Sequence, residues 1–195
     1  MLNDTISLLT YLGTRRSGRP RDMVAPGPSR DELNAILTLA ARTPDHGKIV
    51  PYRFVIVDDD QRDSLAELFA AAVREIDPEV RATKLEKVCA KAHYAPGLVI
   101  LISSPARDHK IPVWEQELTA GAVGMNLLHA THAHGYVGAW ITGDQAYAPA
   151  VISAFCKDGE RIAGYFFLGS PGTMLEERER PDMDEIVTRW CPPAV

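Results

Sequence analysis

Four short runs of apolar and β-branched residues, widely spaced along the chain, constrain its fold more than any other feature of the sequence. They predict strands at residues 53–58, 97–103, 136–141 and 162–168. The segments between them are too long for hairpin turns, and several carry the apolar spacing of helices. Strands that alternate with helices form a sheet layered with helices, so the sequence predicts an α+β (α/β) fold. The first run is apolar between its flanking polar residues, which predicts a strand buried on both faces.

The helical segments show clear start and stop signals. Apolar residues from Ile6 to Leu12 recur at near-helical spacing and stop at Gly13, where a loop begins. Ser29 followed by Glu32 predicts a capping box at the start of the next helix. Residues 114–135 predict a long helix that is rich in alanine and glycine. Because small residues allow another backbone to approach closely, we expect this helix at the centre of the fold.

Length and charge narrow the class of protein. A chain of 195 residues without a linker or internal repeat is expected to form one domain over residues 1–195. The net charge of -5 argues against a general nucleic-acid binder, which normally carries a basic surplus. The three cysteines are isolated in the sequence, which fits a reducing compartment. Without a recognisable signal peptide or a long apolar run, the expected location is the cytoplasm, away from membranes.

A basic cluster between the first and second helices is the first candidate for chemistry. Four arginines fall within residues 15–21, and Ser17 lies among them. Guanidinium groups bind phosphate through paired hydrogen bonds, and a hydroxyl beside them adds another. The cluster therefore predicts a phosphate site, with a solvated basic loop as the plain alternative.

The histidines and carboxylates of the long predicted helix are candidates for a metal site and for an acid–base pair. His129 and His132 share a helix face, but His134 does not, and zinc requires three or four converging ligands. No metal site is therefore expected. Glu115 and Glu117 lie two residues apart on different faces, which makes them a poor acid–base pair. Favourable interaction with the helix dipole is the better explanation for these two carboxylates.

Several segments, in order along the chain, resemble the FMN-dependent nitroreductase family, in particular its members of minimal length. The string Arg15-Arg16-Ser17 is similar to the family's opening motif, and Arg42-Thr-Pro-Asp-His46 before Pro51-Tyr-Arg-Phe54 is similar to its second signature. Residues 135–143 resemble the strand that reaches the flavin ring, and residues 164–171 resemble the last core strand. Two arginines before Pro181 are placed as in the family's C-terminus.

The resemblance implies a fold and a site. The implied fold is a mostly antiparallel sheet flanked by helices, with an extended C-terminal tail, in an obligate dimer that binds FMN at the subunit interface. The implied FMN contacts are Arg15, Arg16 and Ser17 with Arg178 or Arg180 at the phosphate, Arg42 and His46 from the partner chain, and Trp140, Ile141 and Thr142 at the ring. The resemblance also suggests that the nicotinamide is bordered by Ala130, Thr131, His132, Ala133, His134 and Gly135.

The implied activity is oxidation of NADH or NADPH by the flavin, followed by reduction of a nitroaromatic, a quinone or a similar electron-poor acceptor in ping-pong fashion. The chemistry belongs to the cofactor, so no catalytic side chain is assigned. One departure bears on the substrate: Ile141-Thr142 stands where some small relatives carry Arg-Ser after the tryptophan. The alternatives are a specialised flavoenzyme of the same fold, such as a dehalogenase or an ene-reductase, and a flavin- or anion-binding regulatory protein without turnover.

Overall fold

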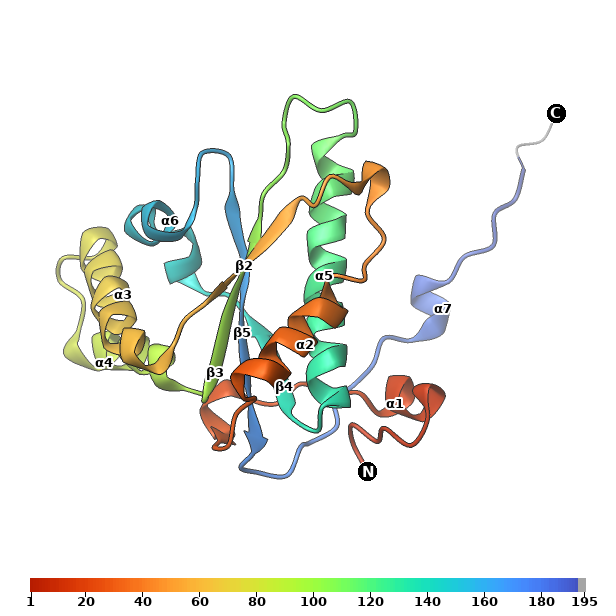
Figure 1. Cartoon of the computed structure of the whole chain (residues 1–195), viewed down its shortest axis with the longest axis horizontal. Helices are drawn as coiled ribbons and strands as arrows, with labels where there is room; N and C mark the ends of the chain where they lie inside the picture. The colour runs from red at the N-terminus through yellow and green to blue at the C-terminus, as the bar shows by residue number, and fades with distance from the viewer. Residues whose placement is uncertain (193–195) are drawn as a thin grey trace.

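The computed structural model describes residues 1–192, and its centre is an antiparallel sheet (Figure 1). The strands are β1 (Met23–Val24), β2 (Tyr52–Ile56), β3 (Gly97–Ser103), β4 (Val137–Ile141) and β5 (Arg161–Pro171). They follow the order β1-β5-β3-β2, and β4 also pairs with β5. Every one of these pairings is antiparallel. The structure thus confirms the predicted sheet flanked by helices.

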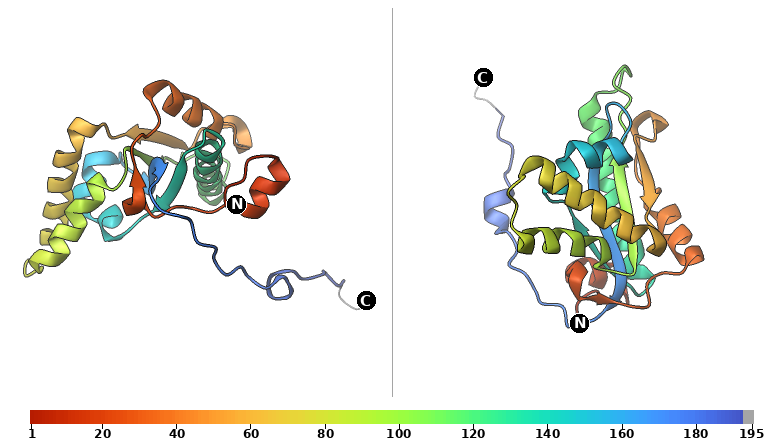
Figure 2. Two further views of the ribbon diagram at one scale, coloured as in Figure 1. Left: turned by 90° about the horizontal axis from the view of Figure 1, so that it is seen from below. Right: turned by 90° about the vertical axis from the view of Figure 1, so that its left-hand side faces the viewer.

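The central strand β3 is buried on both faces because its side chains alternate between two apolar cores. Leu98, Ile100 and Ile102 belong to one core, which also contains residues of α3 (Arg62–Ile76), α4 (Ala82–Ala90) and α6 (Pro149–Phe155). Val99 and Leu101 belong to the other core, with residues of α2 (Arg30–Ala40) and α5 (Val113–Ala133). Figures 1 and 2 show these two helix groups on opposite faces of the sheet.

The predicted capping box marks a real helix start, whereas the predicted end of the first helix at Gly13 is wrong, because α1 (Leu8–Thr14) runs through Gly13. Helix α2 begins after Ser29, whose side chain accepts a hydrogen bond from the Glu32 amide while the Glu32 carboxylate accepts one from the Ser29 amide. This reciprocal pair satisfies two amides that the first turn leaves without helical partners. Helix α5 covers Val113–Ala133, close to the predicted 114–135, and it packs against α2 and the sheet.

The prediction that residues 53–58 form a strand buried on both faces is wrong. Strand β2 ends at Ile56 and lies at the edge of the sheet, where β3 is its one partner among the described strands. Its residues are partly buried, and Ile56 is 38% exposed. An edge strand has a neighbour on one side, so the covering helices reach over it incompletely. The apolar run reflects contact with the cores and carries no information on the strand's place in the sheet.

The first and the last described segments lie outside this layered body. Helix α1 (Leu8–Thr14) packs beside the C-terminal end of α5, and the chain after β5 runs away from the sheet as an extended tail that contains α7 (Met183–Ile186) (Figures 1 and 2). The predicted extended tail is confirmed. Among residues 1–192, no helix combines the length and apolar character that a membrane span requires.

Candidate cofactor site

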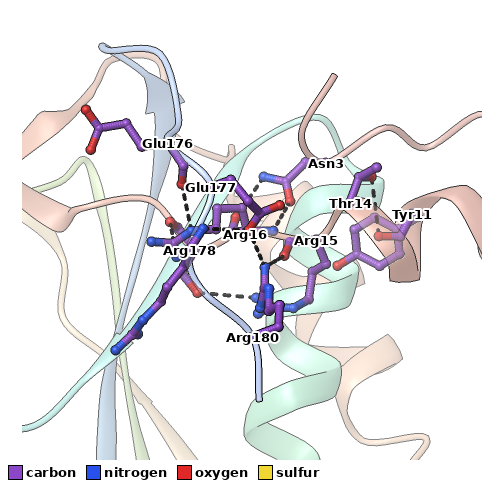
Figure 3. Close-up of polar contacts among 10 residues, drawn as sticks. Asn3, Tyr11, Thr14, Arg15, Arg16, Glu176, Glu177, Arg178 and Arg180 are labelled. Carbon is purple, nitrogen blue, oxygen red and sulfur yellow. Dashed lines mark hydrogen bonds and ion pairs between the residues drawn. The ribbon is translucent and has the colours of Figure 1, made fainter. Parts of the chain in front are cut away.

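The loop Arg15–Ser17 follows directly from the end of α1, and Figure 3 shows the side chains of Arg15 and Arg16 in it. Arg15 Nη1 donates to Ser17 Oγ over 3.3 Å. Arg16 Nη1 donates to the Ser17 carbonyl oxygen over 3.3 Å, and Arg16 Nε donates to the Glu176 carbonyl oxygen over 2.8 Å. Both guanidinium groups are therefore oriented by neighbouring oxygens, which preserves further N–H donors for a bound anion.

Two contacts fix the backbone of this loop. The Asn3 side chain accepts from the Arg16 amide over 2.7 Å and donates to the Arg16 carbonyl oxygen over 2.9 Å. On the other side, the Gly18 amide donates to the Gly138 carbonyl oxygen of β4 over 3.2 Å. The loop is thus clasped by the N-terminal segment and attached to the sheet.

The C-terminal tail brings a further guanidinium to the loop, although more than 160 residues separate them in sequence. Arg180 Nη2 donates to the Arg15 carbonyl oxygen over 3.3 Å and lies 2.7 Å from Glu177 Oε1. Hydrogen bonds from the Arg178 amide and the Arg180 side chain lower the pKa of Glu177, so this carboxylate remains charged. In Figure 3 the Arg178 side chain extends away from Arg15. The geometry thus brings Arg180 rather than Arg178 to the loop.

A cavity of about 370 Å³ lies against this loop, lined by Arg16, Ser17, Arg19, Asp22 and tail residues that include Glu176. Arg19 Nη2 pairs with Glu176 Oε2 over 3.1 Å at an exposed position. Exposed ion pairs exchange partners at little free-energy cost, so a phosphate can replace this carboxylate. The donor set of two or three guanidinium groups and a hydroxyl suits a phosphate monoester. A larger cavity of about 930 Å³ nearby is lined largely by apolar side chains, which cannot neutralise a phosphate.

Strand β4 leads from this loop toward the residues expected at the flavin ring. Gly138 contacts Gly18, and Ile141 follows three residues later, roughly 10 Å along the strand. Trp140 points to the α5 side, where its ring lies 5.1 Å from that of Phe166 and its Nε1 donates to the Ala163 carbonyl oxygen over 3.0 Å. The Trp140 indole therefore packs against its own sheet. Ile141 and Thr142, at the end of β4, are half-buried and are the next residues along the strand from the Arg15–Ser17 loop.

The structure adds a cation that the sequence reading missed. Lys91, at the C-terminal end of α4, lies beside the loop that follows β4, and its Nζ donates to Gln145 Oε1 over 3.1 Å. A Cβ on Gly143 would come within 3.2 Å of the same ammonium group. Burial lowers the pKa of Lys91. The sequence did not single out Lys91, because the spacing of residues in this lysine-rich segment does not distinguish it from the exposed lysines around it.

His46 lies far from the Arg15–Ser17 loop within one chain, whereas the Arg42 carbonyl oxygen accepts from Asn126 Nδ2 of α5 over 3.4 Å. His46 Nδ1 is 2.7 Å from Glu115 Oε2 in the first turn of α5, whereas Tyr11, four residues before Arg15, bonds to His132 in the last turn. Residues 115 and 132 are 17 positions apart, so about 26 Å of helix separates the two groups. The chain by itself thus assembles the Arg15–Ser17 part of the predicted site and leaves His46 at the other end of α5, with Arg42 beside Asn126, about 9 Å of helix before His132.

The residues expected to border the nicotinamide differ in exposure. Ala130, Thr131 and His132 are buried in the chain, whereas Ala133 and Gly135 are exposed and His134 is half-buried. Thr131 Oγ1 donates to the Leu127 carbonyl oxygen, so its hydroxyl is occupied inside the helix. Ala133 and His134 are therefore open to side-chain contact with a ligand and Gly135 to backbone contact, while His132 reaches the wall of the cavity of about 930 Å³.

Comparisons with known proteins agree with this architecture. The model of the nitroreductase family matches residues 12–170. A Haemophilus influenzae protein named "Putative NAD(P)H nitroreductase" is 34% identical over 174 residues, which cover 88% of this chain and 91% of that protein.

Two solved structures share the fold. A nitroreductase-like family protein from Bacillus cereus superposes with a TM-score of 0.82 at 19% identity, covering 96% of this chain and 98% of its own. A Bacteroides fragilis nitroreductase with bound FMN gives a TM-score of 0.65 at 21% identity, covering 90% and 95% of the two chains. The family match, the relative above 30% identity and the shared fold together establish that this chain belongs to the nitroreductase family.

Proposed function

We propose that this chain is an FMN-dependent NAD(P)H oxidoreductase that works as a homodimer and reduces nitroaromatics, quinones or similar flat, electron-poor molecules. The observation that carries the proposal is the convergence of Arg15, Arg16 and Ser17 with Arg180. A positively charged donor set of this kind, in a chain of net charge -5, is suited to a phosphate-bearing cofactor. The Bacteroides fragilis relative, described with bound FMN, supports flavin as that cofactor.

Each part of the chain has a distinct role in this proposal. Arg15, Arg16 and Ser17 bind the phosphate, with Arg180 closing the site from the tail. Ile141 and Thr142 lie along the ring, and the Lys91 ammonium provides positive charge at the loop that follows β4. FMN, when bound, supplies the hydride-transfer chemistry, while the protein orients it and leaves one face open. NAD(P)H and the acceptor use that open face in turn, which predicts ping-pong kinetics.

The proposed dimer is supported by the apolar surface of the single chain. Helix α5 exposes Trp114 and Leu118, which are four residues apart on one face and 67% and 53% exposed. Helix α1 exposes Leu8 and Leu9, at 74% and 83%. Each pair forms an exposed apolar patch, the first near the start of α5 and the second on α1 beside the end of α5, and such patches mark interaction surfaces. A partner chain packed here could also bring its His46 end of α5 toward the Arg15–Ser17 loop, which one chain cannot do.

The visible absorbance spectrum of the purified protein tests this function. We expect a flavin spectrum that bleaches anaerobically when NADH or NADPH is added and returns when a nitroaromatic or quinone follows. A colourless protein that also fails to take up added FMN would overturn the proposal. Bound FMN without bleaching by either nicotinamide would instead favour a flavin-binding protein without turnover.

A further inference from the structure

Tyr11 holds helix α1 on the body of the protein. Among the residues of α1, all of which are described, Tyr11 alone is buried, at 7% exposure. Its hydroxyl lies between two histidines of α5, 2.8 Å from His132 Nδ1 and 2.8 Å from His129 Nδ1. Its ring meets both imidazoles edge-on, at centroid distances of 5.3 and 5.8 Å. The apolar residues of α1 otherwise face outward, so this cluster is its main attachment within the chain.

The hydrogen bonds of this cluster run in one direction. The Gly138 amide donates to His132 Nε2 over 3.3 Å, and a backbone amide can only donate. His132 is therefore neutral, with its proton on Nδ1, and it donates to the Tyr11 oxygen. The Tyr11 hydroxyl proton is then free to be donated to His129 Nδ1. The order is thus Gly138, His132, Tyr11, His129.

The surroundings keep the three side chains of this cluster, His132, Tyr11 and His129, uncharged. Burial, with the nearby Arg15 and His129, lowers the pKa of His132 to about 4, and burial raises the pKa of Tyr11 to about 12. Burial and the charge of Arg15 also lower the pKa of His129. The hydrogen-bond order therefore persists over the physiological pH range.

The chain of bonds meets the Arg15–Ser17 loop at one residue. Gly138 donates its amide to His132 and accepts the Gly18 amide on its carbonyl oxygen. A side chain at position 138 would collide with Leu128, since a Cβ there would lie 2.9 Å from Leu128 Cδ2. Tyr11 attaches the helix before the loop to the cluster, and Gly138 binds Gly18, the residue after the loop. Both ends of the loop are therefore held by contacts with the same cluster.

We propose that Tyr11 is a positioning residue for the phosphate loop: the directed hydrogen bonds through His132 and His129 hold Arg15, Arg16 and Ser17 where they bind the cofactor phosphate. The proposal rests on the proposed function, because it assumes that FMN is the ligand of this loop. It assigns to Tyr11 an effect on the phosphate end of the cofactor and not on the ring.

Comparison of FMN with riboflavin tests this assignment, because riboflavin lacks the phosphate. Tyr11→Phe removes the hydroxyl and keeps the buried ring. We expect the Kd for FMN to rise about tenfold, because the variant loses both hydrogen bonds of the hydroxyl and each contributes roughly a factor of three, while the Kd for riboflavin stays unchanged. Tyr94→Phe is the matched control, since Tyr94 packs against Phe167 on the other face of the sheet. A general loss of structure would weaken both ligands and lower the Tm.

Histidine NMR provides the second readout. Long-range proton–nitrogen spectra of the wild type should show His132 protonated at Nδ1 and His129 at Nε2. Protonation of His132 at Nε2 would overturn the proposed order of bonds. Equal FMN affinity in wild type and Tyr11→Phe, or equal weakening of FMN and riboflavin, would overturn the positioning role while leaving the proposed function intact. A wild type that binds no FMN would instead refute both.

Discussion

Glu160 Oε2 lies 2.6 Å from Arg53 Nη2, and this contact ties edge strand β2 to the start of β5 across the intervening strand β3. The Glu160 side chain is 5% exposed and also accepts from the Ser104 hydroxyl and the Lys157 amide, each over 2.7 Å. The same guanidinium donates to the Phe155 carbonyl oxygen. A carboxylate with this many donors is strongly stabilised in its charged form.

Glu160→Gln should destabilise the protein by about 1–3 kcal/mol, because it leaves Arg53 with a neutral partner. Urea denaturation at neutral pH measures the change, and Glu75→Gln at an exposed site of α3 is the matched control. Hydrogen bonds from Arg53 hold the pKa of Glu160 at about 2, below the usual 4.5. Its contribution is therefore complete above pH 4.5 and declines as the pH falls toward 2. The wild type should lose stability more steeply than Glu160→Gln over that range, and parallel curves would contradict the assignment.

Replacing both Arg15 and Arg16 by alanine should release the cofactor. Each guanidinium offers charge-assisted hydrogen bonds to the phosphate, and losing two of them should raise the Kd for FMN at least about a hundredfold. Fluorescence titration with FMN measures the Kd, and Arg74→Ala with Arg81→Ala, two exposed positions, controls for the loss of two charges. Retention of a full complement of flavin would refute the phosphate assignment.

Lys91→Met should lower the reduction potential of bound FMN. The ammonium lies beside the loop after β4, and a cation there favours the reduced flavin, which gains negative charge. A shift on the order of 30 mV corresponds to about 1.4 kcal/mol for a two-electron couple. Anaerobic redox titration gives the potential, and Lys87→Met, exposed on the same helix, is the control. An unchanged potential would remove Lys91 from the ring site.

Gly164→Ala should displace the Trp140 indole. A Cβ at position 164 would overlap Trp140 Nε1 and Cδ1, so the ring must move off the sheet. Overpacking of this kind costs about 1–3 kcal/mol. The change should be visible both in urea denaturation and in tryptophan fluorescence. Gly13→Ala, where a Cβ would meet nothing within 4 Å, should change stability by less than about 1 kcal/mol.

Local patterns in the sequence were sufficient for the elements whose structure depends on near neighbours. The run Gly97–Ser103 became β3 with the predicted bounds, and the Ser29–Glu32 pair caps α2 as its spacing required. The density of arginines in residues 15–21 likewise identified the loop to which we assign the phosphate in the proposed function. These features depend on hydrogen bonds and side-chain periodicity within a few residues, so the sequence contains their determinants.

The features that depend on distant contacts could not be predicted in the same way. The position of β2 at the sheet edge depends on which strands pair, and its apolar sequence is compatible with an edge or a central place. Lys91 lies beside Gly143 only because the end of α4 packs against the loop that follows β4. Tyr11 lies in a stretch that predicts a helix, but its contact with His132 spans 121 residues. Periodicity carries no information about contacts at such separations.

Leu118→Glu should dissociate the proposed dimer and weaken FMN binding with it. Leu118 continues the exposed face that Trp114 begins on α5, and a buried carboxylate at such an interface has no partner. Sedimentation velocity measures the association state, and the flavin content of the separated species measures binding. Ile76→Glu at the end of α3 is the matched control, because Ile76 is 59% exposed on the opposite side of the sheet. If Leu118→Glu remains a dimer with full flavin, the interface does not include this face of α5. If it becomes a monomer that still binds FMN as the wild type does, the partner contributes nothing to the site, and Arg42 and His46 are not cofactor contacts.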